Sequence, residues 1–145
     1  EKWNGELSKI EVEMMSEEEE IVFYAALYHS CLNPNIFSDV DGKYGGTDLE
    51  IHQTEGFENY TIFSLWDTFR ALNPLFTITQ PQLVPDLINS MLQFYKENGL
   101  LPVWDISSWE ANTMTGYHSI PVIAAFGLGI GRSGAVSHRR PASAV

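Results

Sequence analysis

The sequence predicts a mainly all-α fold, with short strands at the joints between helices. Its clearest amphipathic stripe, the apolar positions from Leu83 to Tyr95, recurs at helical spacing. Ser16, followed by four glutamates, is a strong helix-start signal. The connecting stretches are rich in Trp, Asp, Gly and Asn, and binding residues often lie on such loops over a rigid scaffold. Together these features suit a helical toroid with a pocket at one rim.

Length and charge restrict the classes of function. The 145 residues fit one ordinary domain, and the net charge of -11 argues against nucleic acid or an anionic membrane as a partner. No stretch is long and apolar enough to cross a bilayer, so we expect no membrane span. The single cysteine, Cys31, excludes an intrachain disulfide and a zinc cluster, and its apolar neighbours favour a buried structural thiol. The chain opens at Glu1 rather than Met, which indicates an internal start.

The first thirty residues predict a strand and then a long helix. The alternation over Ile10–Glu13 is typical of a strand that ends before Ser16. The helix is expected from Glu17 to about Leu32, where an Asn-Pro-Asn sequence stops it. Ser16 can cap the first amides, Glu19 can complete a capping box, and the acidic run suits the positive end of the helix dipole. Capping therefore explains the glutamates better than a metal or partner patch.

Residues 39–48 are dense in turn-forming residues and predict a loop or a hairpin. Asp39, Asp41 and Glu50 fall at positions one, three and twelve of an EF-hand calcium loop. The likeness fails because Tyr44 stands where the turn needs glycine, and because no amphipathic helix follows. We reject a calcium site there.

The second half of the chain predicts a β-rich run followed by helices. The Asn73-Pro74 pair can kink or break the first of these helices, because proline lacks a backbone N–H. The expected elements are, in order, a β-rich run over Tyr60–Leu65, a helix from Trp66 to about Phe76, the amphipathic helix ending at Gly99, a loop over Leu100–Asp105 and a last helix from about Gly116 to Ala125.

Three ordered segments of the chain form a specific set: Phe23–His29 with Phe37–Gly42, then Tyr60–Arg70, and then Leu101–Trp104 with Met114, Gly116–His118 and Pro121–Ile123. Together these segments resemble the family 92 glycoside hydrolases, the calcium-dependent exo-α-mannosidases. Their order and spacing match that family across roughly residues 1–124, which is far more specific than a lone Trp-Asp pair.

The resemblance implies an (α/α)6 toroid packed on a β-rich N-terminal domain, with a calcium ion in the sugar pocket. It also implies an enzyme that is secreted, periplasmic or at the cell surface, and that removes terminal α-linked mannose from glycans with inversion. In an inverting glycosidase one carboxylic acid protonates the leaving oxygen and a second carboxylate activates water. The family carries that acid and base beyond the end of this chain, so neither is assigned to a residue here. We therefore expect a fragment of the catalytic domain, whose partners are a mannose-containing glycan and the rest of that domain.

Three neighbouring residues are the main candidates for substrate binding. The resemblance matches Asp67 to an aspartate that hydrogen-bonds mannose hydroxyls, although a helix-start carboxylate stabilising its own amides is the alternative. Trp66 can stack on a sugar face or serve as a core tryptophan. Arg70 lies one helical turn after Asp67 and is expected to orient it through an ion pair.

Two further candidates lie later in the chain. His118, within a family motif, is expected near the pocket rim, and a hydrogen-bonded structural histidine is the alternative. Glu110 and Asp105 flank Trp109 as paired carboxylates, which invites an acid and base assignment. The resemblance places those roles elsewhere, and Glu110 is kept among the candidate substrate-binding residues.

The predicted organisation has three parts. Residues 1–15 end a linker or N-terminal region, residues 16–124 begin the (α/α)6 catalytic domain, and residues 125–145 form an atypical tail. The tail is rich in Gly, Ser and Arg and lacks helical periodicity, which is typical of a frameshifted or truncated gene end or of a linker. Two other functions compete with the mannosidase: another helical-toroid glycoside hydrolase, and a non-catalytic carbohydrate-binding or structural helical module.

Overall fold

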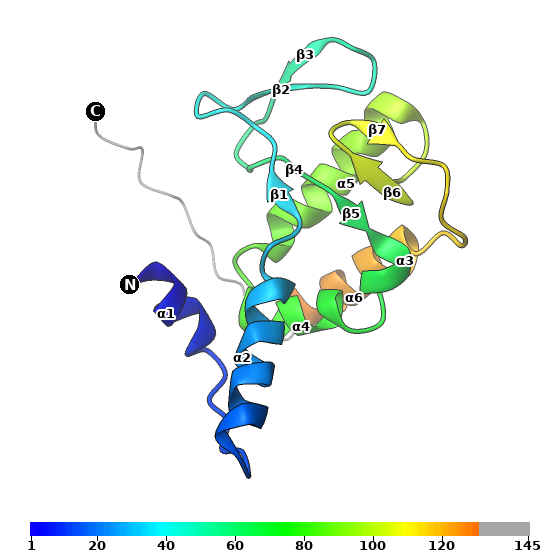
Figure 1. Ribbon diagram of the computed structural model, residues 1–145. Helices are drawn as coiled ribbons and strands as arrows, with labels where there is room; N and C mark the ends of the chain where they lie inside the picture. The colour runs from blue at the N-terminus through cyan, green and yellow to red at the C-terminus, as the bar shows by residue number, and fades with distance from the viewer. Residues whose placement is uncertain (131–145) are drawn as a thin grey trace.

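The computed structural model describes residues 1–130, which contain six helices and seven short strands (Figure 1). The mainly helical prediction is confirmed, and the strands lie between helices as expected. The helices are α1 (Lys2–Leu7), α2 (Glu17–Ser30), α3 (Leu65–Thr68), α4 (Leu72–Thr79), α5 (Val84–Asn98) and α6 (Ser119–Ile130). The strands are β1 (Asn35–Ile36), β2 (Lys43–Gly45), β3 (Ile51–Gln53), β4 (Tyr60–Thr61), β5 (Phe63–Ser64), β6 (Trp104–Ile106) and β7 (Trp109–Glu110).

The strands form three small antiparallel sheets. β1 pairs with β4, and β2 pairs with β3 as the predicted hairpin. The third sheet has the order β5-β6-β7, in which Phe63 lies opposite Asp105 and Ser64 opposite Trp104. This sheet joins the start of α3 to a hairpin that follows it by about forty residues, and so sets the surroundings of Asp67.

The hydrophobic core lies where α4, α5 and α6 meet. Leu87 and Met91 from α5 are completely buried, and Val122 and Phe126 from α6 pack into the same cluster. The amphipathic helix is therefore confirmed. It ends at Gly99, whose φ of 80° is the left-handed conformation that glycine adopts without strain.

The N-terminal region confirms the predicted helix and corrects the predicted strand. The Ser16 hydroxyl accepts a hydrogen bond from the Glu19 amide at 3.2 Å, and α2 runs from Glu17 to Ser30. Ile10–Glu13 is not a strand, because no neighbouring strand pairs with it among the described residues. The unpredicted α1 precedes it and packs on α2, which extends away from the core (Figure 1).

Three element boundaries differ from the prediction. Instead of one helix from Trp66, α3 and α4 are separate, and Pro74 lies in the first turn of α4, where proline is tolerated. Leu100–Asp105 is not all loop, because β6 begins at Trp104. The last helix starts at Ser119 rather than Gly116, since Gly116 has a φ of 81° that no α-helix contains.

The same helix also extends past the predicted end. α6 continues beyond Ala125 to Ile130, because Phe126 is buried one turn after Val122 against the core. The rest of the predicted tail, residues 131–145, lies outside the described residues. Within residues 1–130, no helix has the length and hydropathy needed to span a membrane.

Candidate functional site

Ser64 is the junction between the β5-β6-β7 sheet and the candidate site. It ends β5 and occupies the position just before α3. Its hydroxyl donates a hydrogen bond of 2.6 Å to Asp67 Oδ2, and its carbonyl accepts one of 2.9 Å from the Thr68 hydroxyl. The amide of Asn73, itself buried, donates to the Thr68 hydroxyl at 3.0 Å. Both the hydroxyl and the carbonyl of Ser64 therefore make hydrogen bonds to residues of α3.

Asp67 and Trp66 are accessible at this junction. Asp67 is exposed on the first turn of α3, and Trp66 beside it is 41% exposed. The exposure of Trp66 favours its interpretation as a surface aromatic over a core tryptophan. A hydrogen-bonded carboxylate next to an exposed indole can accept hydrogen bonds from hydroxyl groups while the ring covers an apolar face.

The expected ion pair between Arg70 and Asp67 is not formed. The guanidinium carbon of Arg70 lies 5.6 Å from the ring centroid of Phe69, in a cation–π arrangement. The salt bridges among residues 1–130 involve Lys9, Lys43 and His52. Ser64, which sequence reasoning did not select, is the residue that orients the Asp67 carboxylate. A serine three residues before an aspartate at a helix start is the signal that could have identified it.

His118 lies beside α3, at the start of α6. Its ring stacks on Phe69 with centroids 4.2 Å apart and planes inclined by 26°. Its carbonyl accepts the Val122 amide at 3.1 Å, so the residue also anchors the first turn of α6. Among the described residues, neither the buried Nδ1 of His118 nor the buried hydroxyl of Ser119 has a hydrogen-bond partner. The structure thus brings His118 and Arg70 onto one ring, that of Phe69, which lies two residues after Asp67 in the chain.

Glu110 is engaged with the backbone. Its carboxylate accepts the amides of Val103 at 2.7 Å, Trp104 at 3.1 Å and Asn112 at 3.1 Å. It projects from β7 toward the beginning of β6, and is half-buried. These contacts hold the hairpin together and do not bring Glu110 into direct contact with Asp67.

Asp105 is the deeply buried carboxylate of the same hairpin. It is 3% exposed, accepts a hydrogen bond from the Thr61 hydroxyl at 2.8 Å and another from the Ser108 amide at 3.1 Å. Burial raises the pKa of Asp105 to about 6, although these hydrogen bonds act in the opposite direction. The negative charge of Glu110, directly opposite in the sheet, raises the pKa further.

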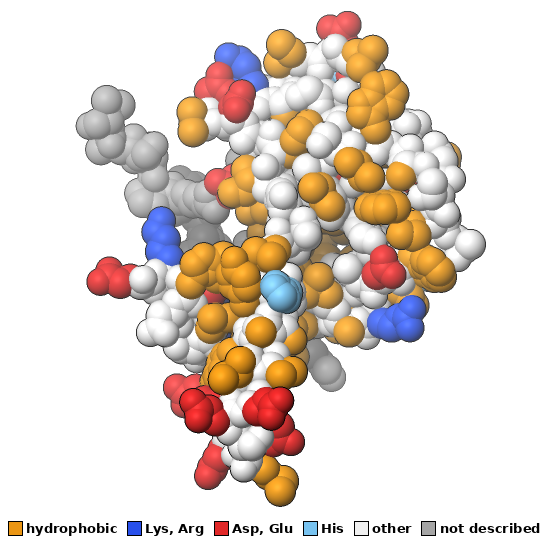
Figure 2. Space-filling model, in the orientation of Figure 1, with side chains coloured by type: hydrophobic (Ala, Val, Ile, Leu, Met, Phe, Trp, Pro, Cys, Tyr) orange, Lys and Arg blue, Asp and Glu red, His pale blue; other side chains and the backbone are white. Residues whose placement is uncertain are grey.

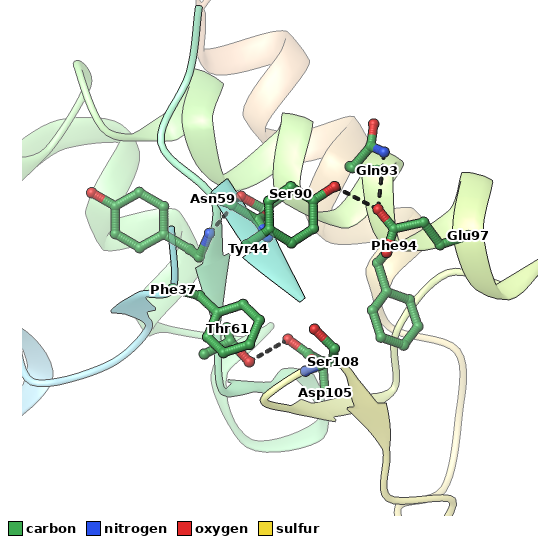
Figure 3. A pocket seen from close by; sticks show the side chains of 11 residues that line it. Phe37, Tyr44, Asn59, Thr61, Ser90, Gln93, Phe94, Glu97, Asp105 and Ser108 are labelled. Atoms are coloured by element: carbon green, nitrogen blue, oxygen red, sulfur yellow. Dashed lines mark hydrogen bonds between the residues drawn. The ribbon is translucent and has the colours of Figure 1, made fainter. Parts of the chain in front are cut away.

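A small cavity next to Asp105 is too small to hold a sugar. Its volume of about 10 Å³ is roughly what one water molecule needs. Figure 3 shows Tyr44 on one side donating to Glu97, and Thr61 on the other donating to Asp105. The Tyr44 hydroxyl lies 2.5 Å from Glu97 Oε1 and joins the β2–β3 hairpin to the end of α5. Burial and the Glu97 carboxylate raise the pKa of Tyr44.

Residues 1–130 contain no cluster of metal-ligating side chains. No three His, Cys, Asp or Glu side chains in that range are grouped so that they could hold an ion. Asp41, a residue of the segment that resembles an EF-hand loop, pairs with Lys43 at 2.7 Å.

A family model described as the glycosyl hydrolase family 92 catalytic domain matches residues 1–133. The chain belongs to glycosyl hydrolase family 92. The family 92 match continues past Ala125, where the sequence alone had indicated a departure from the family pattern. No curated protein matches the chain.

Solved family 92 structures are similar to this chain. A family 92 α-mannosidase from Bacteroides thetaiotaomicron is 43% identical, with a TM-score of 0.78, over 83% of this chain and 16% of that one. The same enzyme in complex with mannoimidazole gives 36% identity and a TM-score of 0.79 over 94% and 20%. A family 92 inverting mannosidase from the same organism gives 30% and 0.78 over 87% and 17%. This family 92 chain therefore spans no more than a fifth of the length of these structures.

Proposed function

We propose that this chain forms part of the catalytic domain of an inverting exo-α-mannosidase that removes terminal α-linked mannose from glycans. The observation that carries the proposal is the 30–43% identity with family 92 mannosidases over more than four-fifths of the chain. In this proposal residues 16–124 begin an (α/α)6 toroid, and the packing of α4 and α5 against α6 supplies part of its helical wall.

The proposed contribution of this chain is to bind one mannose unit at the start of α3. Asp67 accepts hydrogen bonds from sugar hydroxyls, because its carboxylate is exposed and oriented by Ser64. Trp66 offers an exposed indole face for the apolar side of the ring. His118 and Arg70, which both contact the Phe69 ring, are assigned contacts with other polar groups of the glycan.

The proposed reaction divides its groups between this chain and the rest of the domain. Inversion needs a general acid and a general base on opposite faces of the sugar, with room for a water molecule between them. We assign both carboxylates, and the calcium ion, to the rest of the complete enzyme. The described residues do not fit a metal site, so no step is assigned to calcium here. A glycan substrate also leads us to propose that the enzyme is secreted, periplasmic or at the cell surface.

The test is an assay of the complete protein with α-1,2-mannobiose and calcium, followed by proton NMR of the first product. We expect β-mannose to form first, since inversion of an α-linkage gives the β-anomer. Chelation of calcium should abolish turnover and added calcium should restore it. The 145-residue chain alone should be inactive. An α-anomeric first product, or the absence of mannose release by the complete protein, would contradict the proposal.

A further inference from the structure

The Glu110 carboxylate accepts a hydrogen bond from a peptide group that is itself hydrogen-bonded to the first residue of α3. The peptide between Val103 and Trp104 offers two polar atoms, the Val103 carbonyl oxygen and the Trp104 amide hydrogen. Glu110 accepts from the amide at 3.1 Å, and the Val103 oxygen accepts from the Leu65 amide at 3.3 Å. A charged acceptor on one side of a peptide strengthens the hydrogen bond on its other side, because the peptide dipole is polarised.

The same peptide lies opposite the residue that orients Asp67. Ser64 pairs with Trp104 in the β5-β6 ladder, and its hydroxyl donates to Asp67 Oδ2 at 2.6 Å. Leu65, the next residue, is the first of α3, and its carbonyl accepts the Phe69 amide at 3.0 Å. The start of β6 therefore contacts both Ser64, the residue just before α3, and Leu65, the first residue of α3.

The turn of the β6–β7 hairpin is held by other groups. Asp105 accepts the Ser108 amide, and the Thr61 hydroxyl accepts the Ser107 amide at 2.7 Å. These contacts lie at the turn, whereas the Glu110 carboxylate acts at the opposite end of the hairpin, next to α3. Removing its charge should consequently leave the turn in place and loosen the β6 start.

We propose that Glu110 is a positioning residue for Asp67. It acts through the Val103–Trp104 peptide, Leu65 and Ser64, and it does not touch the sugar. This inference rests on the proposed function, in which Asp67 binds mannose. It replaces the direct substrate contact that the sequence led us to expect of Glu110.

The experiment compares Glu110→Gln with a matched control, Glu97→Gln, in the complete protein. Glu97 also accepts a backbone amide, that of Thr47 at 3.2 Å, but it serves the β2–β3 hairpin. We expect Glu110→Gln to lower kcat/KM by about tenfold, since a small misplacement of a binding group has effects of this order. Glu97→Gln should leave kcat/KM within about twofold of wild type. An equal loss in both variants would overturn the proposal, because it would indicate general loosening.

A double-variant cycle tests the route from Glu110 to Asp67. Ser64→Ala removes the hydroxyl that orients Asp67, and the variant that combines it with Glu110→Gln should be no slower than the worse single variant. Independent effects that multiply in the double variant would show that Glu110 does not act through Ser64, and would overturn the inference.

Hydrogen exchange supplies a readout that needs no activity. Amides of residues 63–69 should exchange faster in Glu110→Gln than in wild type or in Glu97→Gln, which should instead loosen residues 43–54. If the wild-type protein releases no mannose, the proposed function is wrong. Hydrogen exchange over residues 63–69 then still tests whether Glu110 positions the start of α3. Unchanged exchange over residues 63–69 in Glu110→Gln would overturn that role whatever the activity.

Discussion

The imidazole ring of His118 stacks on the phenyl ring of Phe69, with centroids 4.2 Å apart. The guanidinium carbon of Arg70 lies 5.6 Å from the centroid of the same ring. Two residues that the sequence identifies as site candidates thus meet on a third that it does not. Phe69 also packs against the hydrophobic core, so this contact couples the candidate site to the packing of α6.

A double-mutant cycle should measure that contact. Phe69→Leu keeps an apolar side chain but removes the ring, and His118→Ala removes the other partner. Each single change is expected to cost about 1 kcal/mol of unfolding free energy, and the pair should show a coupling of similar size. Urea unfolding of the complete protein and its variants provides the values. Simple additivity of the two losses would mean that the stack contributes nothing of its own.

Gly116→Ala should displace His118. The φ of Gly116 is 81°, and an added Cβ would come within 2.3 Å of Cε1 in the His118 ring. We expect a loss of roughly 1–2 kcal/mol in unfolding free energy together with a lower kcat/KM. Gly127→Ala is the matched control in α6, since an added Cβ there meets nothing within 4 Å. It should be neutral or stabilising by up to about 1 kcal/mol. A stable, fully active Gly116→Ala variant would contradict the close contact.

Asp105 should make stability fall as the pH rises. Its pKa is raised from 3.8 to about 6, so between these values the folded state holds a proton that the unfolded state has lost. The stabilisation is therefore complete below about pH 4 and is lost as the pH passes through about 6. Asp105→Asn removes this dependence while its amide oxygen can still accept from Thr61. The difference in unfolding free energy between wild type and variant should shift by about 1–3 kcal/mol between pH 4 and pH 7.5. A difference independent of pH would exclude a raised pKa.

Local signals explain why much of the fold was predictable. The Ser16 cap and the amphipathic stripe of α5 act within a few residues, and both appear where the sequence placed them. The β6–β7 hairpin was missed because its turn uses Ser107 and Ser108 at φ values of 50° and 69° instead of glycine. Ile10–Glu13 alternates like a strand, but pairing with a neighbour decides whether a strand forms.

The candidate site was predictable only in part. Sequence similarity selected Asp67 as a candidate, but it did not identify Ser64, whose hydroxyl donates to the Asp67 carboxylate. The spacing of Arg70 predicted an ion pair with Asp67 that is not formed. Helical spacing shows which side chains can reach one another. It does not show whether the Arg70 guanidinium pairs with the Asp67 carboxylate or packs on the Phe69 ring. The link between Leu65 and Val103 joins residues far apart in the chain, and no local pattern encodes it.

The 145-residue chain by itself should associate through α2. Ile21 and Val22 are 62% and 63% exposed, and Tyr28 and Leu32 of the same region are also exposed. Figure 2 shows apolar side chains along α2 and over the neighbouring surface, with acidic groups at one end of the helix. Apolar patches of this kind promote association. We expect helical circular dichroism, strong binding of the dye ANS and a broad melt. A clean monomer with a sharp cooperative melt would argue against this expectation.

The role of Asp67 can be decided by two substitutions in the complete protein. A carboxylate that accepts hydrogen bonds from sugar hydroxyls contributes roughly 1.5–3 kcal/mol per bond. Asp67→Asn retains an oxygen that can accept from Ser64 but loses the charge, so kcat/KM should fall by about one to two orders of magnitude. Asp67→Ala should lose more, because it also removes the contact with Ser64. Thermal stability should change little in either variant if the role is binding.

A purely structural Asp67 would give the reverse pattern. As an acidic residue in the first turn of α3, it could serve only to stabilise the helix start. Both variants would then lose about 1 kcal/mol of stability while kcat/KM stayed near that of wild type. Measuring both quantities on the same two variants separates the two roles, because binding affects turnover and helix capping affects unfolding. Near-normal kcat/KM in Asp67→Ala would remove Asp67 from the site, and with it the reason for Glu110 to hold the start of α3 in place.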